Sequence, residues 1–191
     1  MRTLVLRLAM VATLGLMAAA CSQPARTDAM IANVTEATVV RPDSPLKESM
    51  TVATVTGGEE TSPLWISKVG NEGFLEALTL SLQQHTMLAT SDGTLTLRVT
   101  LVELEQPFAG FDMEVTSTVR YVVEHKSHGI VFDETIKHAH LQDFSSAFVG
   151  SKRLQLANEG AIRNNIRLFI EKVIAESRQD PARFGGAAPT S

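Results

Sequence analysis

Apolar and polar residues alternate along three consecutive segments of the chain, at about residues 95–101, 111–124 and 130–136. Strict alternation is typical of a strand that buries one face and exposes the other to water. The middle segment shows the pattern most clearly. A β-branched run at 50–56, which ends at a pair of glycines, predicts one earlier strand. The short connections between the three later strands predict an antiparallel meander.

Two other segments repeat their apolar residues with the period of an α-helix. The first begins at Asn71, a favourable N-cap residue, and extends to about Leu88. The second includes the apolar positions from Leu154 to Val173. It also contains Gly160, and a glycine inside a helix costs ~1 kcal/mol relative to alanine unless it permits close packing.

These patterns predict a two-layer α+β fold with the element order β-α-β-β-β-α. An apolar face opposite a face of charged and hydroxyl residues indicates that the sheet is covered on one side only. Four strands at ~4.8 Å spacing make a sheet about 19 Å wide, and two helices about 10 Å across would cover it. We therefore expect an antiparallel sheet of about four strands with two helices on one face. The order of the strands in space stays open.

Composition divides the chain into four parts. Residues 1–20 have the features of a lipoprotein signal peptide: a positively charged start, an apolar run shorter than the ~20 residues of a membrane-spanning helix, and a small-residue cleavage site. Residues 21–47 have little periodicity and are interpreted as a lipidated N-terminus and tether. Residues 48–177 contain the α+β domain, and the composition of residues 178–191 predicts a disordered tail.

Cys21 is the only cysteine, so it cannot form an intramolecular disulfide. It directly follows the predicted cleavage site, where a bacterial lipoprotein carries diacylglycerol and palmitate-like acyl chains. Such chains anchor a protein stably without a spanning helix. The alternative is an unmodified secreted cysteine. Ser22 resembles the residue found at this position in lipoproteins exported to the outer membrane, so we expect a lipid anchor on its periplasmic face.

The charge of the chain limits the classes of partner. Its formal net charge is −4 at pH 7, and removal of the signal peptide would take away Arg2 and Arg7 and make the protein more acidic. An acidic surface is repelled by phosphate backbones and by anionic headgroups. The composition therefore argues against nucleic acid as a partner and against a polybasic membrane-binding patch.

Three long motifs accompany Cys21 in the chain. They are VTGGEETSPLW at 55–65, VGN at 69–71 with Phe74 shortly after it, and LQLANEGAIRNNI at 154–166. Together they resemble a group of small uncharacterised lipoproteins of Gram-negative bacteria, over about residues 44–175. Members of this group sometimes carry the label UDP-N-acetylglucosamine acyltransferase. Enzymes of that name are similar to β-helices built on hexapeptide repeats, and this chain has no six-residue period.

A more distant likeness, of fold alone, is to envelope lipoproteins that attach to transport machines. They include the partner of the barrel that inserts lipopolysaccharide and the auxiliary lipoproteins of lipid-transport ABC systems. This likeness is an analogy, because a fold does not by itself carry a function.

Two histidine patterns are candidates for chemistry. His128 and Asp133 fit the H-x-x-x-x-D spacing of glycerolipid acyltransferases, in which the acid orients a histidine base. The spacing is common by chance, and no glycine-rich acceptor motif accompanies it. His138 and His140 would share one face of a strand, but they lie at its far end from His125 and His128 and lack a full ligand set. We therefore predict no catalytic residue, no metal site and no cofactor.

The glycine-rich loop after the first strand carries Glu59, Glu60 and Trp65. One interpretation is a connecting loop whose tryptophan covers the open end of the core. The other is a protein-docking surface, because tryptophan is enriched at binding hot spots. Phe108 and Phe111, in the loop before the longest predicted strand, have the same two interpretations. These five residues form the candidate docking surface.

Two classes of function follow from these patterns. The first is a non-enzymatic, lipid-anchored envelope protein that docks onto an outer-membrane or periplasmic assembly or transport complex. The second is a periplasmic module that binds a lipid or glycan, or an enzyme acting on such a ligand. An apolar cavity between helices and sheet would favour the second class. A packed interior with an exposed aromatic patch would favour the first.

Overall fold

The structure is a computed structural model that describes residues 23–61, 67–107 and 112–187. In chain order its elements, with 3₁₀ helices marked η, are α2 (Thr27–Met30), η2 (Glu36–Thr38), β1 (Met50–Thr56), α3 (Asn71–Gln84), β2 (Leu95–Glu105), β3 (Met113–His125), β4 (Gly129–Gln142), η3 (Phe144–Ser146), α4 (Gly150–Gln179) and η4 (Ala182–Phe184). Within these ranges, no helix combines the length and the apolar character needed to cross a bilayer.

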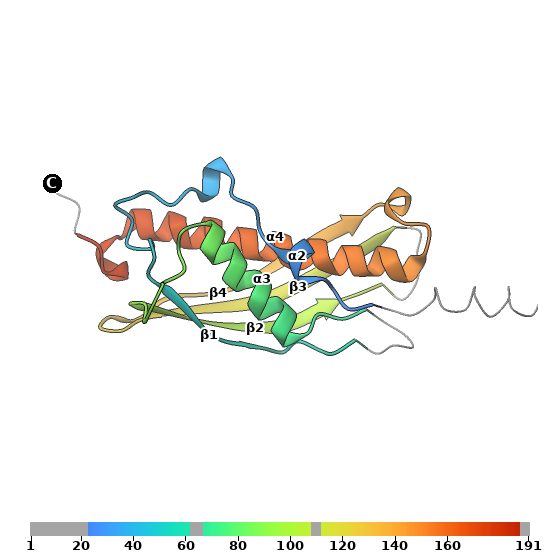
Figure 1. Ribbon diagram of the computed structural model, residues 1–191, viewed down its shortest axis with the longest axis horizontal. Helices are drawn as coiled ribbons and strands as arrows, with labels where there is room; N and C mark the ends of the chain where they lie inside the picture. Colours follow the sequence, from blue (N-terminus) through green and yellow to red (C-terminus); the bar gives the residue numbers. More distant parts are fainter. Residues whose placement is uncertain (1–22, 62–66, 108–111, 188–191) are drawn as a thin grey trace, which may run out of the picture.

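One mixed sheet and the helices on one of its faces form two layers (Figure 1). The strands lie in the order β1-β2-β3-β4, and β2, β3 and β4 form the predicted antiparallel meander. The α+β class is confirmed. The prediction of a wholly antiparallel sheet is wrong for the first pair, because β1 runs parallel to β2. The helix α3 connects these two strands and returns the chain to the end of the sheet where β1 begins.

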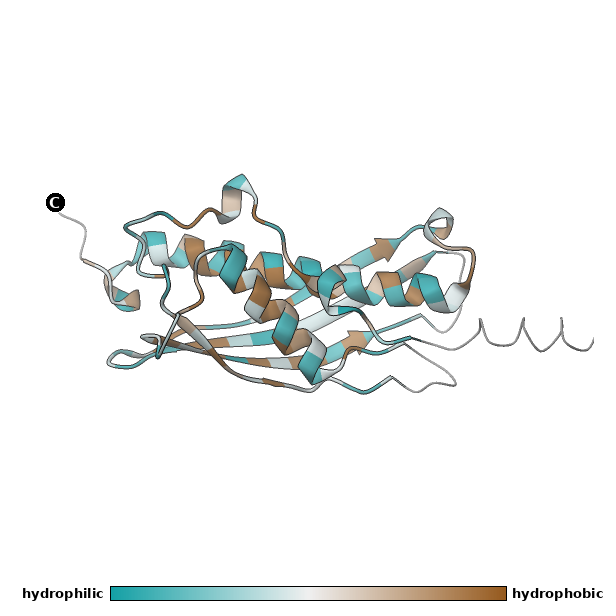
Figure 2. Ribbon diagram, viewed as in Figure 1, coloured by the Kyte–Doolittle hydropathy of each residue, from teal (hydrophilic) through white to brown (hydrophobic). Residues whose placement is uncertain are grey.

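The core lies between the sheet and the helices α3 and α4, whose apolar and polar residues alternate around each helix (Figure 2). Tyr121 on β3 stacks on Phe169 of α4 with ring centroids 4.3 Å apart, and Phe132 of β4 meets Phe169 edge-on at 5.6 Å. The Tyr121 hydroxyl donates to Asn165 Oδ1 at 3.0 Å, so its polar atom is satisfied inside the core. The predicted helix phase, with Phe169 inward, is confirmed.

A bulge changes which residues of β4 face the core. The pairing shifts between Val123 and Glu124, whose partners on β4 are Phe132 and Ile130. Val131 is the additional residue, and both it and Phe132 are buried, whereas Ile130 is 55% exposed. The alternation predicted Ile130 on the inner face, and that prediction is wrong because a bulge places two consecutive residues against one partner.

Polar side chains cover the outer face of the sheet. Cross-strand ion pairs join β2 to β3, β3 to β4, and β4 to β2: Arg98–Glu124, Arg120–Asp133 and Lys137–Glu105. Opposite charges on different strands of a sheet stabilise it weakly, and here they keep the outer face polar. The predicted one-sided covering of the sheet agrees with this distribution.

Both ends of the described chain pack onto the domain. Met30, Ala32 and Leu46 belong to the core, and Phe184 is 1% exposed at the other end. The sequence predicts a tether at 21–47 and a disordered tail from 178, so the described parts of both segments differ from expectation. The apolar residues of these two segments are few and irregularly spaced. Each packs onto the domain singly, so the sequence shows no helical or strand period there.

Candidate functional site

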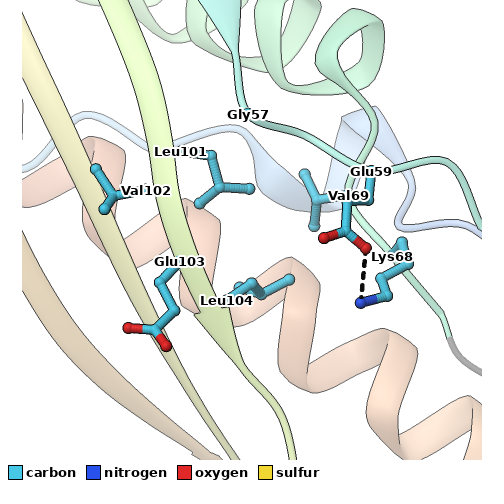
Figure 3. A pocket seen from close by; sticks show the side chains of 8 residues that line it. All are labelled: Gly57, Glu59, Lys68, Val69, Leu101, Val102, Glu103 and Leu104. Atoms are coloured by element: carbon cyan, nitrogen blue, oxygen red, sulfur yellow. Dashed lines mark ion pairs between the residues drawn. The ribbon is translucent and has the colours of Figure 1, made fainter.

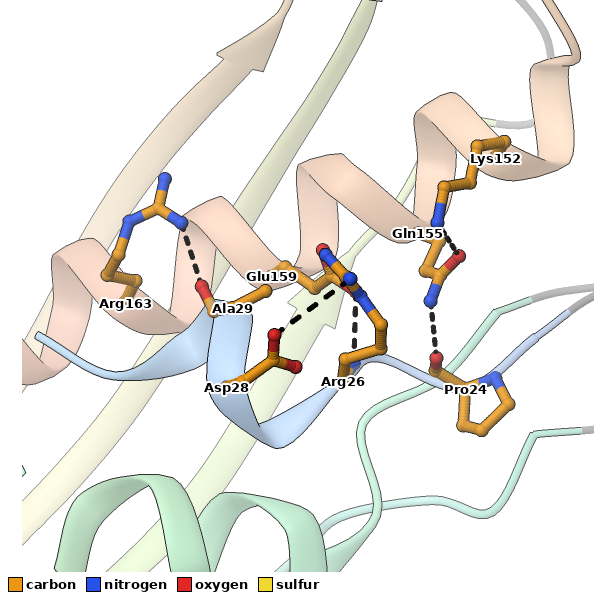
Figure 4. Close-up of polar contacts among 8 residues, drawn as sticks. All are labelled: Pro24, Arg26, Asp28, Ala29, Lys152, Gln155, Glu159 and Arg163. Atoms are coloured by element: carbon orange, nitrogen blue, oxygen red, sulfur yellow. Dashed lines mark hydrogen bonds and ion pairs between the residues drawn. The ribbon is translucent and has the colours of Figure 1, made fainter. Parts of the chain in front are cut away.

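The helix α4 binds the start of the described chain along one of its faces (Figure 4). The Glu159 carboxylate accepts hydrogen bonds from the Arg26 backbone N–H at 3.0 Å and from its guanidinium at 3.1 and 3.4 Å. The side chain of Glu159 is 2% exposed. A carboxylate removed from water in this way needs a partner, and Arg26 supplies both charge and hydrogen bonds. The hydrogen bonds that Arg26 donates to Glu159 and the negative charge of this carboxylate raise the pKa of Arg26.

Two further residues of α4 bind the backbone of the same segment. Gln155 Nε2 donates to the Pro24 carbonyl oxygen at 2.8 Å, and Arg163 Nη1 donates to the Ala29 carbonyl oxygen at 2.7 Å. Gln155, Glu159 and Arg163 are spaced by four residues, so they form one row along the helix. The first function visible for the motif at 154–166 is therefore to hold the N-terminal segment against α4.

A second network joins the residues that flank segments 62–66 and 108–111. Gln106 Nε2 donates to the Ser67 carbonyl oxygen at 2.8 Å and to Asn158 Oδ1 at 2.7 Å. Asn158 Nδ2 also donates to the Ser67 carbonyl oxygen, at 3.0 Å, and both Ser67 and Asn158 are fully buried. Ser67 directly follows segment 62–66, and Gln106 stands just before segment 108–111. We call this region, defined by Pro24, Ser67, Gln106 and Asn158, the Pro24 end of the domain.

The predicted docking residues divide into two groups. Trp65, Phe108 and Phe111 lie outside the described residues. Glu59 and Glu60 are described and exposed. Glu59 pairs with Lys68 at 3.0 Å, and the carboxylate of Glu60 lies against Gly70.

The loop that carries these acids starts with a left-handed turn. Gly57 has a φ of +82°, and a Cβ at this position would overlap the Leu101 carbonyl oxygen. Only glycine tolerates both the positive φ and the close approach of the Leu101 carbonyl oxygen. Gly57 therefore supplies the positive-φ turn that follows β1.

The cavity beside the Glu59–Lys68 ion pair is small (Figure 3). It encloses about 60 Å³ between this loop and the outer part of β2, including Leu101 and Leu104. Ligand pockets usually measure about 300–1,000 Å³. A cavity of about 60 Å³ has room for a few water molecules but not for a lipid or a sugar.

A larger groove lies near the C-terminal end of α4. It measures about 470 Å³, and its lining includes Val40, Arg41, Pro45, Ile174 and Arg178. Both packed chain ends contribute to it, so the groove exists only because residues 40–45 and 181–187 lie on the domain. Its volume is in the range of small-molecule sites.

The two candidate acyltransferase residues have separate partners. Asp133 accepts two hydrogen bonds from Arg120, at 2.8 and 2.7 Å, and these hydrogen bonds lower the pKa of Asp133. The ring of His128 stacks on His125 at 4.2 Å, and His128 Nδ1 lies 3.1 Å from the Arg183 carbonyl oxygen. Asp133 therefore does not orient His128. Among the described residues, no group of three or more His, Cys, Asp or Glu could hold a metal ion.

The sequence did not predict the residues of α4 that bind the N-terminal segment. Gln155, Glu159 and Arg163 are polar residues at every fourth position of α4, beside an apolar row that includes Leu154, Ile162 and Ile166. This row is a detectable signal that one helix face binds a polar segment. Nothing in the sequence identifies that segment as residues 24–29, because the contacts use two backbone carbonyl groups as well as Arg26.

Comparison with known proteins gives a fold. No family model matches the sequence, and no curated protein sequence matches it either. A solved protein from Xanthomonas campestris, described with the family model DUF330, has a TM-score of 0.55 at 13% identity, over 79% of this chain and 98% of that one. The hypothetical protein CT253 from Chlamydia trachomatis has a TM-score of 0.51 at 12% identity, over 70% and 99%.

Rare lipoprotein B from Shewanella oneidensis is more distant, with a TM-score of 0.43 at 13% identity over 69% of this chain and 99% of that one. At that score it carries no argument. Neither the Xanthomonas campestris protein nor CT253 has an enzyme name. The chain therefore shares its fold with a DUF330 protein and with CT253.

Proposed function

We propose that this chain is a lipid-anchored protein of the bacterial cell envelope that docks onto an outer-membrane or periplasmic assembly and catalyses no reaction. The observation that carries the proposal is the binding of Pro24, Arg26 and Ala29 to α4. Cys21 lies three positions before Pro24, and three extended residues reach at most ~10 Å. A lipid on Cys21 would hold the Pro24 end against the membrane.

Three of the proposed docking residues stand close in sequence to described residues of the same end. Trp65 stands two residues before Ser67, and Phe108 stands two residues after Gln106. Ser67 and Gln106 are hydrogen-bonded to each other, and this supports the idea that aromatic residues of both loops serve one surface. The exposed Glu59–Lys68 ion pair is the kind of polar group that surrounds the apolar centre of an interface.

The geometry of the described residues supports docking over catalysis. The cavity near the loops is too small for a substrate, and His128 and Asp133 are bound to different partners. A non-enzymatic role needs neither a pocket nor a paired base. It needs an exposed surface held in a fixed orientation. The row of Gln155, Glu159 and Arg163 on α4 holds the N-terminal segment in place and so fixes the orientation of the domain relative to its proposed anchor.

Substitution of the acylated residue tests the anchor. We expect Cys21→Ala to abolish metabolic labelling with palmitate and to leave the protein unprocessed or free in the periplasm. A matched variant, Ser22→Asp, keeps the cysteine and should keep the label while moving the protein to the inner membrane. Unchanged labelling and fractionation of Cys21→Ala would remove the lipoprotein interpretation.

The groove at the far end of α4 favours a second candidate, the binding of a lipid or glycan. A ligand there would raise the melting temperature in proportion to the logarithm of its concentration above the dissociation constant. We would test phospholipid headgroup analogues and short glycans by thermal unfolding. Ala187→Trp, at the rim of the groove, should abolish any such shift if the groove is the site.

A further inference from the structure

Exposed apolar side chains gather in one short segment. Of the nine large apolar side chains that are exposed among the described residues, four lie between positions 141 and 149. They are Leu141 (59% exposed), Phe144 (43%), Phe148 (94%) and Val149 (45%). We call these four residues the 141–149 patch. Single exposed apolar residues are common on protein surfaces, but a cluster of them usually marks a contact with a protein or a membrane.

The segment that carries the patch is held in place by polar contacts. Arg153 Nη1 donates to the carbonyl oxygens of Ala147 and Phe148 at 2.7 and 3.1 Å, and its guanidinium lies 4.6 Å from the centre of the Phe144 ring. Asp112 Oδ1 accepts from the Phe144 N–H at 3.0 Å. The backbone on both sides of Phe148 is thereby fixed, and the exposure of this side chain is built into the fold.

The patch lies beside the attachment of the N-terminal segment. Arg153, which holds the patch, and Gln155, which binds Pro24, are two residues apart on α4. Gln155 is five residues from the first residue of α4, and five helical residues span ~7.5 Å. In Figure 1 the connection from β4 to α4 lies at the end of the molecule where the described chain begins, and the part of it just before α4 is brown in Figure 2.

We infer that the 141–149 patch is a second membrane contact, inserted into the interfacial layer of the bilayer that holds the Cys21 lipid. This inference rests on the proposed lipid anchor. Cys21 can lie no more than ~10 Å from Pro24, so the acyl chains and the patch are within reach of the same bilayer surface. A tethered patch has a high effective concentration at that surface, so a weak contact is sufficient.

A lipid surface fits the chemistry of the patch better than an acidic or basic protein does. Its four side chains are uncharged. Two carboxylates beside it, Asp112 and Asp143, already accept backbone N–H groups. The insertion therefore depends on burial of apolar area and not on anionic lipids. Two contacts, the lipid and the patch, would fix the tilt of the domain and the direction in which Trp65 and Phe108 emerge.

The test uses the chain from Cys21 to Ser191 coupled through the Cys21 thiol to maleimide lipid in phosphatidylcholine vesicles. Coupling by chemistry makes the result independent of lipidation in cells. In a Trp65→Phe background, Phe148→Trp reports on the patch and Ile130→Trp reports on the exposed turn at the opposite end of β4. Brominated acyl chains quench tryptophan that enters the bilayer.

We expect Phe148→Trp to lose most of its fluorescence and to emit at shorter wavelength, while Ile130→Trp stays bright. Equal emission of the two variants would overturn the inference and assign the patch to a protein partner. A double variant, Phe148→Ser with Val149→Ser, should melt like the parent chain and abolish the quenching of a tryptophan placed at position 144. A failure of palmitate labelling in cells would contradict the anchor and leave the vesicle result unchanged.

Discussion

The imidazole of His140 occupies the space that a side chain at position 160 would need. A Cβ built on Gly160 would overlap His140 Nε2. On its other side the ring of His140 lies 3.1 Å from Asn164 Nδ2, and burial lowers the pKa of His140. The glycine that weakens α4 in isolation therefore permits close approach of β4, and His140 packs between the two elements.

Alanine at position 160 tests this packing. We expect Gly160→Ala to lower the free energy of unfolding by ~1–3 kcal/mol, because overpacking outweighs the ~1 kcal/mol gained in helix propensity. Gly73→Ala is the matched control in α3, since its nearest neighbours would lie at an ordinary 3.6 Å. The control should gain up to ~1 kcal/mol. Urea unfolding followed by circular dichroism measures both, and a stabilised Gly160→Ala would refute the close contact.

The short helix α2 and the residues before it depend on α4 for their position. Glu159 accepts the Arg26 backbone N–H as well as its guanidinium, and its neighbours along the same row bind two carbonyl oxygens. A four-residue helix is not stable in isolation. Its position is therefore set by side chains of another element.

Removal of the Glu159 carboxylate should release this segment. We expect Glu159→Ala to cost ~1–3 kcal/mol, because it leaves the Arg26 N–H without its acceptor, and to speed hydrogen exchange and tryptic cleavage at Arg26. Glu171→Ala is the control on the same helix, where the partner Arg167 lies one turn away and both side chains are partly exposed. If the two variants show the same exchange at residues 26–31, α4 does not hold the segment.

The period of the apolar residues predicted the helices and strands that bury a continuous face. It did not predict the segments that pack through isolated side chains. The strands of the meander and the inward face of α4 at Phe169 follow from repeated apolar positions. The parallel direction of β1 could not be predicted from its own residues. It depends on the end of the sheet to which α3 returns the chain before β2. The packing of residues 24–46 depends on isolated side chains such as Met30 and Leu46, and isolated contacts have no period.

Three features converge at one end of the domain. The N-terminal segment, the hydrogen-bonded pair Ser67 and Gln106, and the 141–149 patch all lie near the first half of α4. The opposite end carries the turn between β3 and β4 and the groove formed by both chain ends. This polarity supports a protein that stands on the membrane with its proposed docking loops near the lipid surface. It also explains why the candidate ligand groove and the candidate docking loops can be tested separately.

Site-specific photocrosslinking in cells tests docking most directly. A photoreactive amino acid at position 65 is compared with one at position 130, which is 55% exposed at the opposite end, each in the parent chain and in Cys21→Ala. We predict one envelope protein crosslinked from position 65, no such adduct from position 130, and loss of the adduct in Cys21→Ala. Absence of any adduct from position 65, with Trp65→Ala lowering only the melting temperature, would contradict docking and identify Trp65 as a structural residue.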